Sequence, residues 1–134
     1  MTATALLWPA IAQVALTGAV YGALGVARGR AIIERRVADT DFAPGTEPAD
    51  SAAIRRHLAN QFEMPILFFV VVGYLVTLGA ATAFEVWVAW AFVVSRIAHT
   101  FGALRGPLRL RHATFTAGTL LVAALWASLA WRIW

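Results

Sequence analysis

Four long apolar segments constrain the fold of this chain more than any other feature. Each has about the 20 residues that a helix needs to cross roughly 30 Å of hydrocarbon. They occupy residues 6–27, 58–79, 83–104 and 113–131. A helix satisfies its own backbone polar groups, as the interior of a bilayer requires. The sequence therefore predicts an all-α integral membrane four-helix bundle, with helices spanning approximately 6–27, 54–79, 83–104 and 111–132.

The composition agrees with a membrane protein of one domain, residues 1–134. Sixty per cent of the residues are hydrophobic and only 13% are charged, whereas a soluble domain carries about 25% charged residues. All 11 basic residues are arginines, and most lie at the boundaries of the apolar segments, so the positive balance does not indicate nucleic-acid binding. Cysteine is absent, which excludes disulfides, thiolate metal ligands and a cysteine nucleophile.

The arginines also predict an orientation in the membrane. Nine of the 11 lie at the first and third connections: Arg28, Arg30, Arg35, Arg36, Arg55, Arg56, Arg105, Arg109 and Arg111. Arginine-rich loops stay on the cytoplasmic side, so both termini are expected outside. The six tryptophans fall in the opposite half of the bundle, as an aromatic belt does. Taken singly, the arginines of the third connection are typical anchors to lipid phosphate.

Polar residues inside the second and third segments predict a site. Arg56, Asn60 and Glu63 have the i, i+4, i+7 spacing of one helix face. Glu63 and Arg96 lie symmetrically about a turn near position 79, so they are expected at the same depth. The same symmetry brings Asn60 level with His99. We therefore expect the two polar rows to face each other near the inner edge of the hydrocarbon.

This set of residues carries a surplus of positive charge. The set contains one acid, Glu63, and four arginines: Arg28, Arg56, Arg96 and Arg111. Guanidinium groups bind carboxylates bidentately, so the surplus favours an anionic ligand. An alternative is that Glu63 and Arg96 form a buried ion pair that only holds the bundle together. No metal site is expected, because no histidine is paired with a carboxylate at i, i+4.

Several motifs together resemble the MAPEG family, the membrane-associated proteins of eicosanoid and glutathione metabolism. They are Arg56-xxx-Asn60-xx-Glu63 at the start of the second helix, Arg96-Ile97-Ala98-His99-Thr100 in the third, Ala27-Arg28-Gly29-Arg30, and Leu104-Arg105-Gly106-Pro107-Leu108-Arg109. The run from Phe62 to Phe68 is more similar to a bacterial branch of the family, which implies the bacterial inner membrane.

The resemblance implies a homotrimer with three sites between subunits, and glutathione as co-substrate. By resemblance Arg56, Asn60, Glu63 and His99 would hold the tripeptide, with Arg28 and Arg96 contributing. Arg111 would lie near the sulfur and lower the thiol pKa, which makes it the expected catalytic residue. A lipophilic electrophile would enter from the membrane and be conjugated or reduced, as in a glutathione transferase or peroxidase.

The chain also departs from the pattern of the glutathione-using members. Ala103 replaces a tyrosine one turn past His99, and Phe115 stands where a second aromatic hydroxyl is expected. The length of the third connection leaves Arg109 as an alternative to Arg111. A second hypothesis therefore stays open, in which the protein is a non-catalytic membrane module whose polar residues serve oligomer assembly. A transporter is a third hypothesis. It is less favoured, because the charged residues gather near one face of the membrane.

Overall fold

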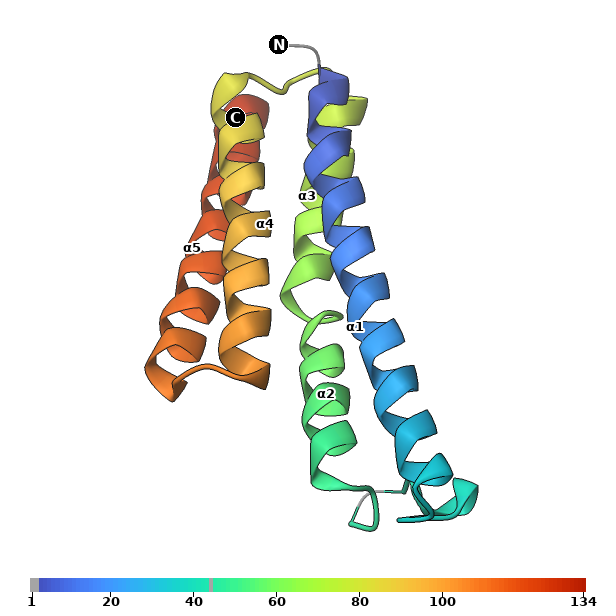
Figure 1. Cartoon of the computed structure of the whole chain (residues 1–134). Helices are drawn as coiled ribbons and strands as arrows, with labels where there is room; N and C mark the ends of the chain where they lie inside the picture. Colours follow the sequence, from blue (N-terminus) through green and yellow to red (C-terminus); the bar gives the residue numbers. More distant parts are fainter. Residues whose placement is uncertain (1–2, 44) are drawn as a thin grey trace.

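Helices form almost all of the computed structural model, which describes residues 3–43 and 45–134, without the side chain of Asp39 (Figure 1). The α-helices are α1 (Leu7–Ile33), α2 (Ala49–Asn60), α3 (Met64–Thr77), α4 (Ala83–Leu104) and α5 (Leu108–Ile133). Two short 3₁₀ helices, η1 (Ala3–Leu6) and η2 (Asp39–Asp41), precede α1 and α2. The all-α prediction is confirmed for the described residues, which contain no strand.

Four helical stretches are long and apolar enough to cross a membrane. They are Ala3–Ile33, Ala49–Thr77, Ala83–Leu104 and Leu108–Ile133. Two of them begin earlier than their hydropathy predicts, because polar turns extend α2 and α5 at their N-terminal ends. The prediction of four spans is confirmed, and the expected third connection shrinks to three residues, 105–107.

The second span is not one continuous helix, contrary to expectation. α2 ends at Asn60, α3 begins at Met64, and Glu63 between them has φ −93° and ψ −92°. Pro65 explains the break, since proline lacks an N–H and its ring disfavours helical geometry in the preceding residues. Glu63 therefore does not continue the helical face of Arg56 and Asn60, and the expected i, i+4, i+7 row is wrong at its third member.

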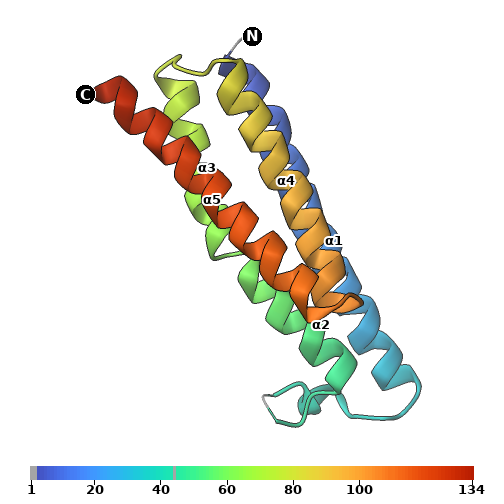
Figure 2. The ribbon, with the colours of Figure 1, turned by 90° about the vertical axis from the view of Figure 1, so that its left-hand side faces the viewer.

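The turn expected near position 79, between the second and third spans, lies where the sequence predicts it. α3 and α4 are joined around Gly79, whose φ of +61° suits a glycine. Phe68 of α3 stacks on Phe92 of α4 with ring centroids 4.4 Å apart, in the middle of the main core. α5 runs antiparallel to α4 and also lies against α3 (Figure 2).

α4 and α5 approach each other closely because small residues face across them. A Cβ on Gly118 would lie 3.0 Å from Ser95 Oγ, and one on Gly102 would lie 3.0 Å from the backbone nitrogen of Arg111. Gly106, in the turn, packs on Gly102 even more tightly. These contacts set the position of the first turns of α5 relative to α4.

The buried carboxylate of the bundle is Glu85, which the sequence reasoning overlooked. It is 0% exposed at the start of α4, where it accepts from the Thr82 backbone N–H at 2.7 Å and pairs with Arg132 at 2.6 Å. Ser128 of α5 also donates to it. The Thr82-x-x-Glu85 capping box before an apolar run was the available signal. Glu63, in contrast, is exposed.

The first connection is tied to the helices that it joins. Glu47, whose side chain is 1% exposed, pairs with Arg28 of α1 at 2.8 Å and with Arg55 of α2 at 2.6 Å. Arg28 also lies over the ring of Phe42, 5.0 Å from its centroid. α1 and α2 continue past the level of the α4–α5 turn, so this connection forms one end of the molecule (Figure 1).

Candidate functional site

A cavity of ≈ 430 Å³ opens where α2 breaks and where α4 meets the start of α5. We call it the large cavity. Its lining residues are Asn60, Glu63, His99, Arg111, His112, Phe115 and Thr116. Four of these, Asn60, Glu63, His99 and Arg111, are site residues predicted from the sequence. The structure therefore brings an amide, a carboxylate, an imidazole and a guanidinium group to one space.

His99 fixes the geometry between α4 and the first turns of α5. Its Nδ1 lies 3.0 Å from the backbone oxygen of Arg111, so the ring donates there. The side chain is 1% exposed, and its Nε2 has no hydrogen-bond partner among the described residues. Phe115 covers the ring from α5, with centroids 5.8 Å apart. The absence of a side chain at Gly102 lets the backbone at Arg111 come close enough to α4 for these contacts.

Arg96 is buried beside the large cavity but does not line it. It is 1% exposed, and its Nη2 donates to the backbone oxygen of Asn60 at 3.2 Å. That oxygen is available because α2 ends there. The alternative, a buried ion pair of Glu63 and Arg96, does not form: among the described side chains, no carboxylate lies within ion-pair distance of Arg96.

The other two predicted arginines lie outside the large cavity. Arg28 is held by Glu47 in the first connection, away from the lining residues. Arg56 lines a separate space of ≈ 30 Å³, the small cavity, together with Ala53, His57, Ala103 and Arg111. Arg111 is thus the one residue common to both cavities. The roles proposed for Arg28, Arg56 and Arg96 in ligand binding stay predictions.

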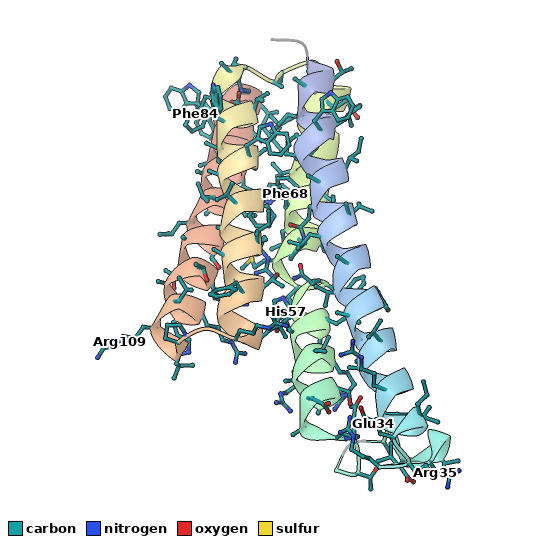
Figure 3. All side chains as sticks on the ribbon, in the orientation of Figure 1. Glu34, Arg35, His57, Phe68, Phe84 and Arg109 are labelled. Carbon is teal, nitrogen blue, oxygen red and sulfur yellow. The ribbon has the colours of Figure 1, made fainter. Side chains whose placement is uncertain are left out.

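The structure favours Arg111 over Arg109 as the cation near the site. Arg111 lines the large cavity, whereas Arg109 is exposed and is not among the lining residues. Figure 3 shows Arg109 pointing away from the bundle at the start of α5. Arg109 and Arg111 are two residues apart on α5, so their side chains face different directions.

A buried chain of polar side chains connects α1, α2 and α4 and was missed from the sequence. Gln13 Nε2 donates to Gln61 Oε1 at 3.0 Å, and Gln61 Nε2 lies 3.0 Å from His57 Nε2. The same His57 nitrogen lies 2.9 Å from Thr100 Oγ1. His57 sits between α2 and the lower end of α4 (Figure 3), with its ring centroid 5.3 Å from that of His99. The only signal in the sequence was Gln13, a single glutamine inside an apolar helix, and this signal does not identify the residues that it contacts.

A comparison with family models assigns the chain to a known group. The model of the MAPEG family matches residues 6–131, nearly the whole chain. The chain belongs to the MAPEG family. This MAPEG protein is an integral, multi-pass membrane protein, in agreement with its four helices of membrane length. A comparison with curated proteins finds no match. Within residues 3–43 and 45–134, no group of three or more His, Cys, Asp or Glu side chains is arranged to hold a metal ion.

Proposed function

We propose that this MAPEG protein binds glutathione or a similar small anionic thiol in the large cavity and conjugates it to lipophilic electrophiles. The observation that carries the proposal is the convergence of Asn60, Glu63, His99 and Arg111 on one cavity. Its volume of ≈ 430 Å³ lies within the range of about 300–1,000 Å³ typical of small-molecule sites.

The lining groups complement the ends of such a peptide. Arg111 can hold a carboxylate, and Glu63 is the one carboxylate of the lining that can pair with an ammonium group. Asn60 and Thr116 offer amide and hydroxyl groups that donate and accept. Phe115 adds an apolar wall, which suits an electrophile that arrives from the lipid.

Arg111 is the group proposed to act on the thiol. A cation beside a thiol stabilises the thiolate, which is the nucleophilic form. The thiol proton leaves to solvent, the thiolate attacks an electrophilic carbon, and a C–S bond forms as the leaving group departs with its electron pair. Reduction of a hydroperoxide by two equivalents of the thiol is the related chemistry, with a disulfide, an alcohol and water as products.

The quaternary arrangement and the orientation belong to the same proposal. A homotrimer would place a neighbouring subunit against each large cavity, with the first and third connections cytoplasmic and both termini outside. Gly18, Gly22 and Gly25 support close contact with another helix, since no neighbour lies within 4 Å of a Cβ built on them.

Thermal unfolding of the detergent-solubilised protein tests ligand binding. Glutathione and its S-hexyl analogue are expected to raise the unfolding midpoint progressively with the logarithm of their concentration, and the folded state should be stabilised by about 1.4 kcal/mol at ten times Kd. Arg111→Gln should lower the affinity about tenfold or more, since a hydrogen bond to a charged group contributes about 1.5–3 kcal/mol. Arg109→Gln is the matched control and should leave the affinity unchanged. No shift with either ligand would contradict the proposal.

A second candidate is a non-catalytic membrane module. The observation that favours it is the number of polar groups already satisfied within one subunit, such as Arg28 on Glu47 and Arg96 on the Asn60 carbonyl. This candidate predicts that Arg96→Leu changes the oligomeric state, measured by light scattering in detergent, while neither glutathione nor S-hexylglutathione alters the unfolding midpoint.

A further inference from the structure

The titratable groups that line the large cavity differ in their freedom to gain and lose a proton. They are Glu63, His99, Arg111 and His112. A guanidinium group stays protonated in proteins, so Arg111 can stabilise a thiolate but cannot accept the proton that the thiol loses. In the proposed function Glu63 pairs with the ammonium group of the ligand. Neither of these two residues is therefore free to act as a base.

His99 is also committed, because both nitrogens of its ring are enclosed by the protein. Its Nδ1 lies 3.0 Å from the backbone oxygen of Arg111 and donates to it. Its Nε2 is buried, and the rings of His57 and Phe115 pack against it with centroids 5.3 and 5.8 Å away. A new charge inside this packing would be costly. His99 is therefore a positioning residue, which orients the start of α5.

His112 is the remaining titratable group of the lining, and its side chain is free. The residue is exposed, and it forms no hydrogen bond or ion pair with another described residue. On α5 it shares a face with Phe115 and Thr116, at i+3 and i+4, and it directly follows Arg111. A thiol held near Arg111 would thus lie close to an imidazole, the side chain best suited to proton transfer near neutral pH.

We propose that His112 takes the proton of the thiol and returns it to the electrophile, so that the preferred substrates are those that need this proton, such as epoxides. This inference rests on the proposed binding of a thiol in the large cavity. The S–H proton passes to the imidazole, and the thiolate attacks an epoxide carbon. The C–S bond forms as the C–O bond breaks with its electron pair going to oxygen. The imidazolium then protonates that oxygen, which gives an alcohol and neutral His112.

Electrophiles with an anionic leaving group need no such return of the proton. In an aryl halide the halide departs with its electron pair, and the proton on His112 goes on to solvent. Loss of His112 should therefore separate the two classes of substrate, because only the epoxide requires a proton at its oxygen. A residue with a merely structural role would affect both classes alike.

Substrate comparison in the detergent-solubilised protein tests the return of the proton. The probes are styrene oxide and chlorodinitrobenzene, with glutathione as the thiol. His112→Gln keeps a polar side chain that cannot carry a proton, and it should lower kcat for styrene oxide about 100-fold. Turnover of chlorodinitrobenzene per bound thiolate should fall much less, and Arg109→Gln, the matched control, should change neither. Equal losses with both probes, or no loss in His112→Gln, would overturn the proposal.

A count of released protons tests the first transfer without any electrophile. Glutathione is mixed with the protein in weak buffer at mildly alkaline pH, where imidazole is mostly neutral. Thiolate is measured by its ultraviolet absorbance and protons by an indicator dye, with S-hexylglutathione, which has no thiol, as the blank. The unchanged protein should form thiolate with little proton release, whereas His112→Gln should release about one proton per thiolate.

The outcomes of the proton count separate this inference from the proposed function. Equal proton release per thiolate in the two proteins would contradict the role of His112 and would leave thiol binding in the large cavity supported. Absence of any thiolate or of any binding would contradict the proposed function itself, and this inference with it. If neither probe is turned over, the proton count decides.

Discussion

Among single residues, Glu47 has the clearest effect on the structure outside the membrane. Its carboxylate is 1% exposed and joins Arg28 of α1 to Arg55 of α2. Burial alone raises the pKa of this carboxyl, but the hydrogen bonds from both arginines outweigh burial, so the pKa lies below its ordinary value near 4.5. A depressed pKa means that the folded state is stabilised by the ionised form.

Glu47→Gln should therefore destabilise the protein in a pH-dependent way. The expected loss is about 1–2 kcal/mol near neutral pH, at the low end for charged hydrogen bonds because both guanidinium groups stay partly hydrated. The stabilisation is fully present above the ordinary pKa near 4.5 and is lost as pH falls through the lower pKa of the folded state. Unfolding midpoints of both proteins from pH 7 to pH 3 should converge at the acid end. A constant difference down to pH 3 would contradict this assignment.

Residues of the site differ in how far sequence could predict them. Asn60 and His99 were predictable, because helical spacing and the turn near Gly79 define where they lie along their helices. Glu63 also lines the large cavity, but the helical row that predicted it is interrupted before Glu63. The partners of His57 and Arg96 were not predictable. Gln61 lies in the break after α2 and Thr100 lies on α4, and Asn60 contributes a backbone oxygen to Arg96, so no side-chain pattern reveals these contacts. The same reasoning expected Arg28 at the site, but the buried Glu47 holds it in the first connection.

At the scale of helices, hydropathy predicts where spans exist better than it predicts their continuity. The four spans and the turn near Gly79 follow from apolar runs and a short uncharged connection. The break between α2 and α3 depends on Pro65, whose effect on the preceding turn is local and is not visible in hydropathy. That break shapes the candidate site, since it frees the Asn60 carbonyl for Arg96 and places Glu63 at the large cavity.

The contact between α4 and α5 should be sensitive at Gly102. In Gly102→Ala the new methyl group would meet backbone atoms of Arg111 at 3.0 and 3.2 Å, and backbone cannot move aside as a side-chain tip can. We expect a net loss of about 1 kcal/mol, because the steric cost of about 1–3 kcal/mol exceeds the gain in helix propensity. Binding of glutathione should weaken as well, since Arg111 shifts with the start of α5.

Gly29→Ala is the matched control for Gly102→Ala. No atom lies within 4 Å of a Cβ built on Gly29, so the gain in helix propensity should appear alone, as a stabilisation of up to about 1 kcal/mol. Chemical or thermal unfolding of both variants in detergent measures the difference. Effects of the same sign and size in the two variants would contradict the close approach at Gly102.

On the scale of the whole molecule, its two ends differ in chemistry. Exposed tryptophans, among them Trp8, Trp87 and Trp131, gather at the end where α4 begins and α5 finishes. The arginine-rich connections lie at the other end, where Arg105 and Arg109 are exposed. Sequence alone predicted this polarity, because it depends on composition near the span ends and not on side-chain contacts.

The proposed orientation can be tested with single cysteines, since the chain has none of its own. Ala43→Cys lies exposed in the first connection, and Leu78→Cys lies exposed beside the α3–α4 turn. In intact bacterial cells with a permeabilised outer membrane, a maleimide that cannot cross the inner membrane should label Leu78→Cys at once. It should label Ala43→Cys only after the inner membrane is lysed. The reverse pattern would invert the orientation.

The unequal reach of the helices has a consequence for how two reactants could meet. α4 has 22 residues, about 33 Å, close to the roughly 30 Å of a hydrocarbon core, and α1 and α2 extend past its turn with α5 (Figure 1). In the proposed arrangement that turn would lie at the edge of the hydrocarbon, with the ends of α1 and α2 in water. Arg111 and His112, which line the large cavity, would then lie just inside that edge, with Phe115 and Thr116 a turn deeper. A hydrophilic peptide and an oil-soluble electrophile would thus encounter each other at the boundary between their two phases, and neither would have to leave the solvent in which it dissolves.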